Sequence, residues 1–260
     1  MDGIRYAVED GVATITLDRP TAKNAFTLDM VDMWAEYVQQ AHRDPAVGAL
    51  VLTGAGDAFC AGGDLSTISD MTSRAMAGKE ALANRIHRVA FAMEAMDKPT
   101  IAAVNGVAVG AGMDMALMCD IRFMARSARM GEGYVKLGLV PGDGGAYYLP
   151  RIVGTAKALE LLLTGDFVDA DEALRIGLVA RVVDDESLLK ETQTFAARLA
   201  AGPPLAIRMI KRAVYRSLDT DLRTSLDLIS SHMGLVATSE DAREAIAAMK
   251  EKRTPMFTGR

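Results

Sequence analysis

Short apolar runs alternate with helical stretches over the first half of this 260-residue chain, and this alternation constrains the fold more than any other feature. The runs at 48–52, 100–104 and 121–125 have the length and composition of buried strands. Helical spacing of apolar residues is found at 79–96 and again from Gly112. Strands that alternate with helices are typical of α/β folds, so we predict an α/β body.

The two ends of the chain have different patterns. Near the N-terminus, apolar residues alternate at 4–8 and 13–17 on either side of a Glu-Asp-Gly turn, which predicts a β-hairpin. After Pro150 nearly every segment has helical spacing. We therefore predict a body over residues 1–195 and a helical region over 196–260, whose apolar faces pack on the body or on another subunit.

Composition excludes several classes of protein. Half of the residues are hydrophobic and 24% are charged, the balance of a soluble globular protein with a large core. Lys and Arg total 29 against 34 Asp and Glu, and the resulting net charge of −5 argues against a nucleic-acid partner. The two cysteines and three histidines are too scattered for a metal site. We expect no metal.

One apolar stretch, residues 101–118, could be mistaken for a membrane span. Asn105 and Asp114 interrupt it, and a central Asp costs roughly 2.5–3.5 kcal/mol to insert into a bilayer. We interpret the stretch as buried core and expect no membrane partner. The chain starts without the charged-then-apolar pattern of a secretory signal, so we expect a cytoplasmic location.

Three glycine-rich loops are the strongest candidates for a functional site. They occupy 59–64, 105–114 and 139–145, and the first two each follow an apolar strand and precede a helix. Glycine lets backbone N–H groups point at a ligand, so two such loops could hold the oxygen of a developing oxyanion. Each loop taken alone could equally be a tight turn and nothing more.

Other glycine-rich sites fit the sequence less well. A dinucleotide site needs a third small residue in its motif, but Met115 occupies that position after Gly110 and Gly112. The sequence has no Walker motif and no G-x-S-x-G motif, which argues against a P-loop protein and against an α/β-hydrolase.

Taken together, several segments resemble the enoyl-CoA hydratase/isomerase (crotonase) family, and they follow in order across nearly the whole chain. They are Arg19-Pro20-x-x-x-Asn24-Ala25, Phe59-Cys60-Ala61-Gly62-Gly63-Asp64, Asn105-Gly106-x-Ala108-x-Gly110-x-Gly112, Cys119-Asp120, Gly138-Leu139-Val140-Pro141, Leu163-Thr164-Gly165 with Ala170-x-Glu172-Ala173-x-x-x-Gly177-Leu178-Val179, and the closing Ser239-Glu240-Asp241 through Phe257.

The resemblance implies a crotonase-like spiral of ββα units with a helical C-terminal trimerisation region that also covers the active site. It implies an acyl-CoA thioester substrate, no cofactor beyond that coenzyme A, and a homotrimer or hexamer. By position, the family's two oxyanion-hole N–H donors fall on Ala61 and Ala111. The substrate-binding residues that it implies are Lys23, Ala25, Ala61, Gly62, Gly63, Asp64, Leu65 and Gly110.

The chain departs from the family at its two catalytic glutamates, of which one activates water and the other exchanges a proton with the α-carbon. The first falls on Asp114, and a gap-free count from Asp120 to Pro141 places the second on Tyr134. An Asp carboxylate reaches less far than that of Glu, and a Tyr hydroxyl with an ordinary pKa of about 10 is a poor base. Ordinary two-glutamate hydration is therefore in doubt.

Asp143 is the carboxylate that could compensate for this departure. In relatives of this family, a carboxylate at or beside this loop position isomerises dienoyl-CoA, closes rings on CoA thioesters or hydrolyses cyclic diketones. An Asp before two glycines is also a common helix N-cap, so both interpretations stay open here. Tyr134 could donate a proton, orient the substrate or only line the pocket, and Glu132 is a further carboxylate that a local shift could bring in.

We therefore predict an acyl-CoA-processing enzyme, a lyase or isomerase. It would be an enoyl-CoA hydratase or double-bond isomerase that acts through an oxyanion-stabilised thioester enolate, with Asp114, Asp143 and Tyr134 as catalytic candidates. One alternative is a C–C hydrolase or ring-forming relative that uses Asp143. Another is a non-catalytic acyl-CoA-binding protein, which the missing glutamates would explain.

Overall fold

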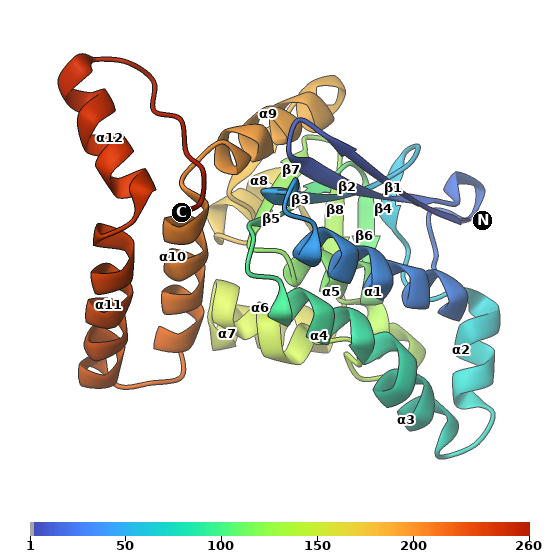
Figure 1. The fold of residues 1–260 in the computed structure, drawn as a ribbon. Helices are drawn as coiled ribbons and strands as arrows, with labels where there is room; N and C mark the ends of the chain where they lie inside the picture. Colours follow the sequence, from blue (N-terminus) through green and yellow to red (C-terminus); the bar gives the residue numbers. More distant parts are fainter. Residues whose placement is uncertain (1–2) are drawn as a thin grey trace.

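The computed structural model describes residues 3–260 and has a body built on two β-sheets, from which three C-terminal helices extend (Figure 1). The larger sheet has the strand order β1-β2-β3-β5-β7-β10. β1 and β2 form the predicted antiparallel hairpin, and the later pairings in this sheet are parallel. The strands are β1 (Gly3–Glu9), β2 (Val12–Asp18), β3 (Ala49–Gly54), β5 (Thr100–Val104), β7 (Ile121–Ala125) and β10 (Arg181–Val183).

The smaller sheet consists of three-residue strands in the order β4-β6-β8-β9. Its strands are β4 (Ala58–Cys60), β6 (Val107–Val109), β8 (Arg129–Gly131) and β9 (Phe167–Asp169). Because β3 and β4, β5 and β6, and β7 and β8 are consecutive in the chain, each turn of the chain adds one strand to each sheet. This confirms the predicted ββα spiral.

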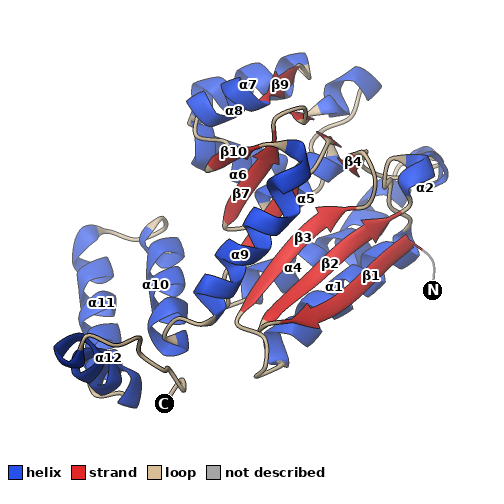
Figure 2. Cartoon of the chain, turned by 90° about the horizontal axis from the view of Figure 1, so that it is seen from above, coloured by secondary structure: helices blue, strands red, loops and turns tan. Residues whose placement is uncertain are grey.

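Helices cover both faces of the larger sheet (Figure 2). On one face, α1 (Leu28–Arg43) packs against α4 (His87–Ala95). Thr27 is the N-cap of α1, and its side chain accepts a hydrogen bond from the Met30 N–H. On the other face, α9 (Leu188–Ala200) lies against β2, β3, β5 and β7. The strand β5 is consequently buried at every residue, as its apolar sequence predicted.

The segment between β4 and β5 contains several short helices rather than the single helix predicted at 79–96. They are α2 (Leu65–Thr72), α3 (Ala77–Ala81), a π-helical turn at Leu82–Ile86, and α4. The π-helical turn packs on the loop that precedes α6. The two are so close that a Cβ added at Gly142 would lie 3.1 Å from the Leu82 side chain.

The second half of the body continues the spiral with short helices. The stretch 101–118 forms β5, β6 and α5 (Ala111–Leu117), and α5 is buried at every residue, as expected of core. The later elements are a 3-10 helix at Gly133–Leu137, α6 (Gly145–Val153), α7 (Thr155–Thr164) and α8 (Ala170–Arg175). Within residues 3–260, no helix is both long enough and apolar enough to cross a membrane.

The helical tail consists of α10 (Pro204–Ser217), α11 (Leu222–Ala237) and α12 (Glu240–Glu251), which project away from the body (Figure 1). The boundary predicted at residue 195 falls inside α9, which belongs to the body, so the tail begins at α10. Asp120 at the start of β7 fastens α10 to the body. Lys211 Nζ lies 2.8 Å from its Oδ2, and the Tyr215 hydroxyl donates to its Oδ1 at 2.7 Å.

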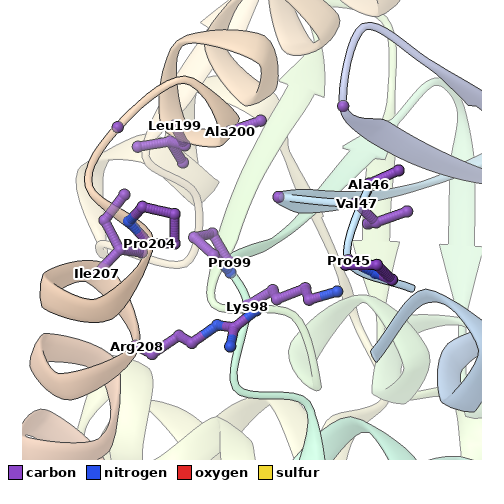
Figure 3. A pocket seen from close by; sticks show the side chains of 13 residues that line it. Pro45, Ala46, Val47, Lys98, Pro99, Leu199, Ala200, Pro204, Ile207 and Arg208 are labelled. Atoms are coloured by element: carbon purple, nitrogen blue, oxygen red, sulfur yellow. The ribbon is translucent and has the colours of Figure 1, made fainter. Parts of the chain in front are cut away.

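A small cavity of about 110 Å³ lies at the junction of body and tail, between residues 45–48, 98–99 and 199–208 (Figure 3). Lys98 lies beside it, and its Nζ donates hydrogen bonds to the carbonyls of Ala41 and Asp44 at 2.7 and 2.6 Å. The cavity is at the edge of the large sheet where β3 and β5 begin. The glycine-rich loops follow the opposite ends of the strands, so this cavity belongs to the junction.

Candidate active site

The first two glycine-rich loops meet because β4 and β6 pair in parallel, which places the segments that follow them side by side. The approach is too close for side chains. A Cβ at Gly112 would lie 2.1 Å from the Cys60 carbonyl oxygen, and a Cβ at Gly62 would lie 3.1 Å from that of Val109 and 3.7 Å from the Ala111 nitrogen. Glycine at both positions therefore brings the 61–64 loop against the first turn of α5.

The backbone donors in these loops differ from those that the family resemblance implied. The Ala61 N–H donates to the carbonyl of Lys23 at 2.9 Å, so the expectation that Ala61 is an oxyanion donor is wrong. By contrast, no hydrogen bond among the described residues uses the N–H of Gly63 or of Ala111. The N–H groups of Gly63 and Ala111, on the two facing loops, are therefore the candidate donors to an oxyanion.

Several residues implied in substrate binding gather around the 61–64 loop. Lys23 and Ala25 follow the 3-10 turn Pro20–Ala22, and the Lys23 carbonyl joins this turn to Ala61. Leu65 begins α2 with 83% of its surface exposed. The structure thus brings together two segments that are about forty residues apart in the sequence.

Both carboxylate oxygens of Asp64 hold this loop in place. Oδ2 accepts a hydrogen bond from Arg19 Nη1 at 2.9 Å, and Oδ1 accepts one from the Ser66 N–H at 3.0 Å, which caps α2. Because both oxygens are engaged in holding the loop, Asp64 has a structural part in the site.

A buried cluster of Asp114, Tyr134 and Asp143 lies beside the free N–H of Ala111. Asp114 is fully buried one turn into α5, and Asp143 is 5% exposed in the loop before α6. The Tyr134 hydroxyl lies 2.7 Å from Oδ2 of Asp114 and 2.7 Å from Oδ2 of Asp143. The three catalytic candidates proposed from the sequence therefore form one hydrogen-bonded group.

The protons in this group can be counted. A tyrosine has a single O–H to donate, so it can satisfy only one of the two carboxyl groups. The other 2.7 Å contact is a hydrogen bond only when that carboxyl group is itself protonated and donates to the Tyr134 oxygen. With both bonds formed, one Asp is an acid and the other a base, and the tyrosine hydroxyl connects them.

Burial supports this sharing of protons. Burial, and then the negative charge of Asp143, raise the pKa of Asp114 to about 7, although the Tyr134 hydrogen bond opposes the shift. Burial likewise raises the pKa of Asp143, although its own hydrogen bond with Tyr134 and the nearby His87 oppose the shift. Burial first, and then the two carboxylates, raise the pKa of Tyr134, so its hydroxyl stays protonated.

Asp143 is not the helix cap that the sequence left open. The N-cap of α6 is Gly144, and no side chain caps that helix. A φ of 122° at Gly144 turns the backbone into α6, which favours glycine. The carboxylate of Asp143 is instead directed to the Tyr134 hydroxyl.

Comparison with known proteins agrees with this geometry. The sequence model of the enoyl-CoA hydratase/isomerase family matches residues 7–260. The chain belongs to this family. It is accordingly an enzyme of the lyase or isomerase type that processes acyl-CoA, which confirms the prediction made from its motifs.

Relatives that are named for different activities have similar sequence identity to this chain. It is 40% identical over 261 residues to 1,2-epoxyphenylacetyl-CoA isomerase of Escherichia coli, with all of both chains covered. It is 38% identical to crotonyl-CoA hydratase of Syntrophomonas wolfei, over 96% of this chain and 95% of that one. The solved enoyl-CoA hydratase of Bacillus anthracis superposes with a TM-score of 0.94 at 33% identity, with both chains fully covered.

Glu132 adds a third carboxyl group to the site of this hydratase/isomerase. It follows β8, is 1% exposed, and lies against Asp114. A Cβ at Gly145 would lie 2.4 Å from Oδ1 of Asp114 and 2.8 Å from Oε1 of Glu132. The sequence offered Glu132 only as a residue that a local shift could bring in, and the fold does bring it in.

The acidic cluster has none of the features of a metal centre. Over residues 3–260, no group of three or more His, Cys, Asp or Glu side chains has an arrangement that could hold a metal ion.

Proposed function

We propose that this protein isomerises the double bond of an unsaturated acyl-CoA through a thioester enolate. The observation that carries the proposal is the position of the Tyr134 hydroxyl, which fills the space between the two aspartates at 2.7 Å from each. A water molecule activated by both carboxyl groups would need that space. Isomerisation needs no water, because one proton leaves a carbon and one proton returns to another.

The proposed reaction balances with the groups present. Asp114 and Asp143 share one proton through Tyr134, and in the form that reacts this proton lies on Asp143. Ionised Asp114 then takes a proton from the α-carbon of a β,γ-unsaturated acyl-CoA, and the negative charge moves to the thioester oxygen. The N–H groups of Gly63 and Ala111 stabilise that oxyanion, at roughly 3–4 kcal/mol per donor. Protonated Asp143 then returns a proton to the γ-carbon, which leaves the double bond between the α- and β-carbons. The Tyr134 hydroxyl passes the proton from Asp114 to Asp143 and resets the pair.

Asp114 is assigned to the α-carbon because of its place on α5. It lies three residues after Ala111, so both are on one face of the same helix. A thioester oxygen held by the Ala111 N–H would therefore place the adjacent α-carbon near Asp114. Coenzyme A, as part of the substrate, is the only group outside the protein that this reaction needs.

The test compares two substrates in one absorbance assay. A β,γ-unsaturated acyl-CoA should gain the absorbance of a conjugated thioester as it is isomerised. Crotonyl-CoA and longer α,β-unsaturated acyl-CoAs should lose most of that absorbance only if they are hydrated, because the isomerisation equilibrium favours the conjugated thioester. Rapid hydration with no isomerisation would contradict the proposal.

Hydration is the second candidate, because the relative in Syntrophomonas wolfei is named a crotonyl-CoA hydratase. It would require water to enter beside Tyr134. A C–C hydrolase or ring-forming reaction would also use Asp143. A protein that binds acyl-CoA without any turnover would indicate a non-catalytic member. The same substrate panel, analysed by mass spectrometry, distinguishes these outcomes.

Tyr134→Phe is expected to lower the kcat of isomerisation by about 10- to 100-fold, because hydrogen bonds to charged groups contribute about 1.5–3 kcal/mol. Asp114 and Asp143 would lose the hydroxyl that connects them, although both carboxyl groups would remain. Tyr147→Phe is the matched control, since that side chain is 50% exposed on α6. Equal kcat values for the two variants would mean that Tyr134 only lines the pocket.

We also propose that the tail assembles the protein into a homotrimer or hexamer. Along α11, Leu222, Leu226, Ile229 and Met233 are spaced three and four residues apart and are 40–73% exposed. An apolar row of this kind marks an interaction surface. The tail contacts its own body at the edge where the strands of the larger sheet begin, whereas the active site lies beyond the other ends of the strands. A tail that covers an active site would therefore belong to another copy of the chain.

Light scattering at micromolar concentration is expected to give the mass of three or six chains. Leu226→Glu with Ile229→Glu should shift the mass toward one chain, because charges would be buried in the interface. Ser231→Glu, on the opposite side of α11 and exposed, is the control that should keep the assembly. A wild-type monomer would refute the assembly.

The cytoplasmic location stays a prediction of the sequence.

A further inference from the structure

Glu132, which lies against Asp114, is the buried carboxyl group that the proposed reaction leaves unused. Oδ1 of Asp114 and both carboxyl oxygens of Glu132 are buried, and they have no hydrogen-bond partner among the described residues. Two buried carboxyl groups side by side cannot both carry a charge without a large cost, unless a cation compensates them.

The titratable and charged groups around the pair offer almost no compensation. They are Tyr134 from the 3-10 helix, Asp143 from the loop before α6, Tyr148 from α6, Cys60 from β4 and His87 from α4. His87 is the one that can become a cation, and it is associated with Asp143 and with the Gly142 carbonyl rather than with Glu132. A proton on one carboxyl group is the remaining way to satisfy the pair.

The surroundings decide which group holds the proton. Asp114 has the Tyr134 hydroxyl at Oδ2, which stabilises a negative charge there. Neither oxygen of Glu132 has such a donor. Burial, and then the charge of Asp114, raise the pKa of Glu132 to about 10, above the value of about 7 for Asp114. At neutral pH, Glu132 is therefore the acid of the pair.

We propose that Glu132 is a positioning residue that stays protonated and donates its carboxyl proton to Oδ1 of Asp114. This bond keeps the negative charge on Asp114, fixes the rotation of its carboxylate, and presents Oδ2 to Tyr134 and the substrate. Gly145 makes the contact possible, because a Cβ at that position would lie against both carboxyl groups. The inference rests on the proposed function only in naming Asp114 as the base.

Infrared spectroscopy tests the protonation of Glu132 without relying on any activity. A protonated carboxyl group has a C=O band that an ionised one lacks. Wild-type protein above neutral pH is expected to show such a band, and Glu132→Gln should lose it. If Glu132→Gln folds and every protonated-carboxyl band of the wild type is also present in the variant, Glu132 is ionised in the wild type and the proposal is refuted. If the variant does not fold, a wild-type spectrum with no protonated carboxyl band above neutral pH refutes it equally.

The pH dependence of proton transfer tests the positioning. The measured quantity is exchange of the α-hydrogens of butyryl-CoA in deuterated buffer, which needs the base and the oxyanion hole but no double bond. Glu132→Gln keeps an N–H donor, so its exchange midpoint should match that of the wild type. Glu132→Met has no donor, so its midpoint should rise by about one pH unit and its rate at neutral pH should fall about fivefold.

The outcomes separate the two proposals. If the wild type exchanges α-hydrogens but does not isomerise, the proposed function fails and the positioning can still be measured. If Glu132→Met and Glu132→Gln both keep the wild-type midpoint, the positioning fails and isomerisation is unaffected. If the wild type does not exchange, the infrared experiment alone decides on Glu132.

Discussion

Asp114→Asn is expected to lower the kcat of isomerisation by about 10²–10⁴, the usual contribution of general acid–base catalysis. Asn keeps the size of the side chain and a hydrogen bond to Tyr134, but it cannot accept the α-proton. Exchange of α-hydrogens should fall by a similar factor, while the affinity for acyl-CoA changes little. Asp171→Asn, at an exposed position of α8, is the control that should retain full turnover.

The pH profile of the wild type gives the same assignment a second test. The active form of Asp114 is the ionised one, and its pKa in the free enzyme is about 7. The kcat/KM of isomerisation should therefore rise as pH passes through that value, and it should fall again at the higher pH at which Asp143 loses the proton that it donates. An acid limb close to the ordinary Asp value of about 4 would contradict a buried base.

Asp114→Asn is also expected to stabilise the protein at neutral pH. In the unfolded chain, Asp114 ionises near an ordinary pKa of about 3.9, whereas folding raises the value to about 7. Between these two pH values the unfolded state releases the proton more readily, so the free energy of unfolding falls as pH rises. Asn removes this effect. The Tm of the variant should exceed that of the wild type at neutral pH, and the difference should disappear in acid.

The sequence predicted the larger sheet better than the smaller one, and the reason is the length of the strands. β5 and β7 begin and end where they were predicted, because each is a run of five residues of which all but one are apolar. The strands β4, β6 and β8 have three residues each, which is too short to show a periodic pattern. They were apparent only through the family resemblance.

The candidate site likewise has one part that the sequence predicted and another part that it did not. Asp114, Tyr134 and Asp143 were identified from motif positions, and they do lie together. Motif positions could not show which backbone N–H groups are free to bind a ligand. The Ala61 N–H, for example, donates to the carbonyl of Lys23, which belongs to a separate loop. The contact between Asp114 and Glu132 likewise depends on how closely Gly145 approaches both. No spacing in the sequence encodes that approach.

Asp143→Asn is expected to lower the kcat of isomerisation by about 10²–10⁴ as well, but for a different reason. The variant loses the acid that returns a proton to the γ-carbon, whereas Asp114 can still remove the α-proton. Exchange of α-hydrogens should therefore continue at a rate close to that of the wild type. Asp114→Asn loses both reactions, so the pair of variants assigns one proton-transfer step to each carboxyl group.

Combining the two substitutions tests whether the aspartates act as a unit. If Tyr134 passes protons between them, the double variant should isomerise no more slowly than Asp114→Asn alone, because the relay is already broken. Multiplied losses would mean that the two carboxyl groups act independently. Wild-type turnover in Asp143→Asn would leave the second proton transfer to Tyr134. In that case Tyr134→Phe, rather than Asp143→Asn, should stop isomerisation while α-hydrogen exchange continues.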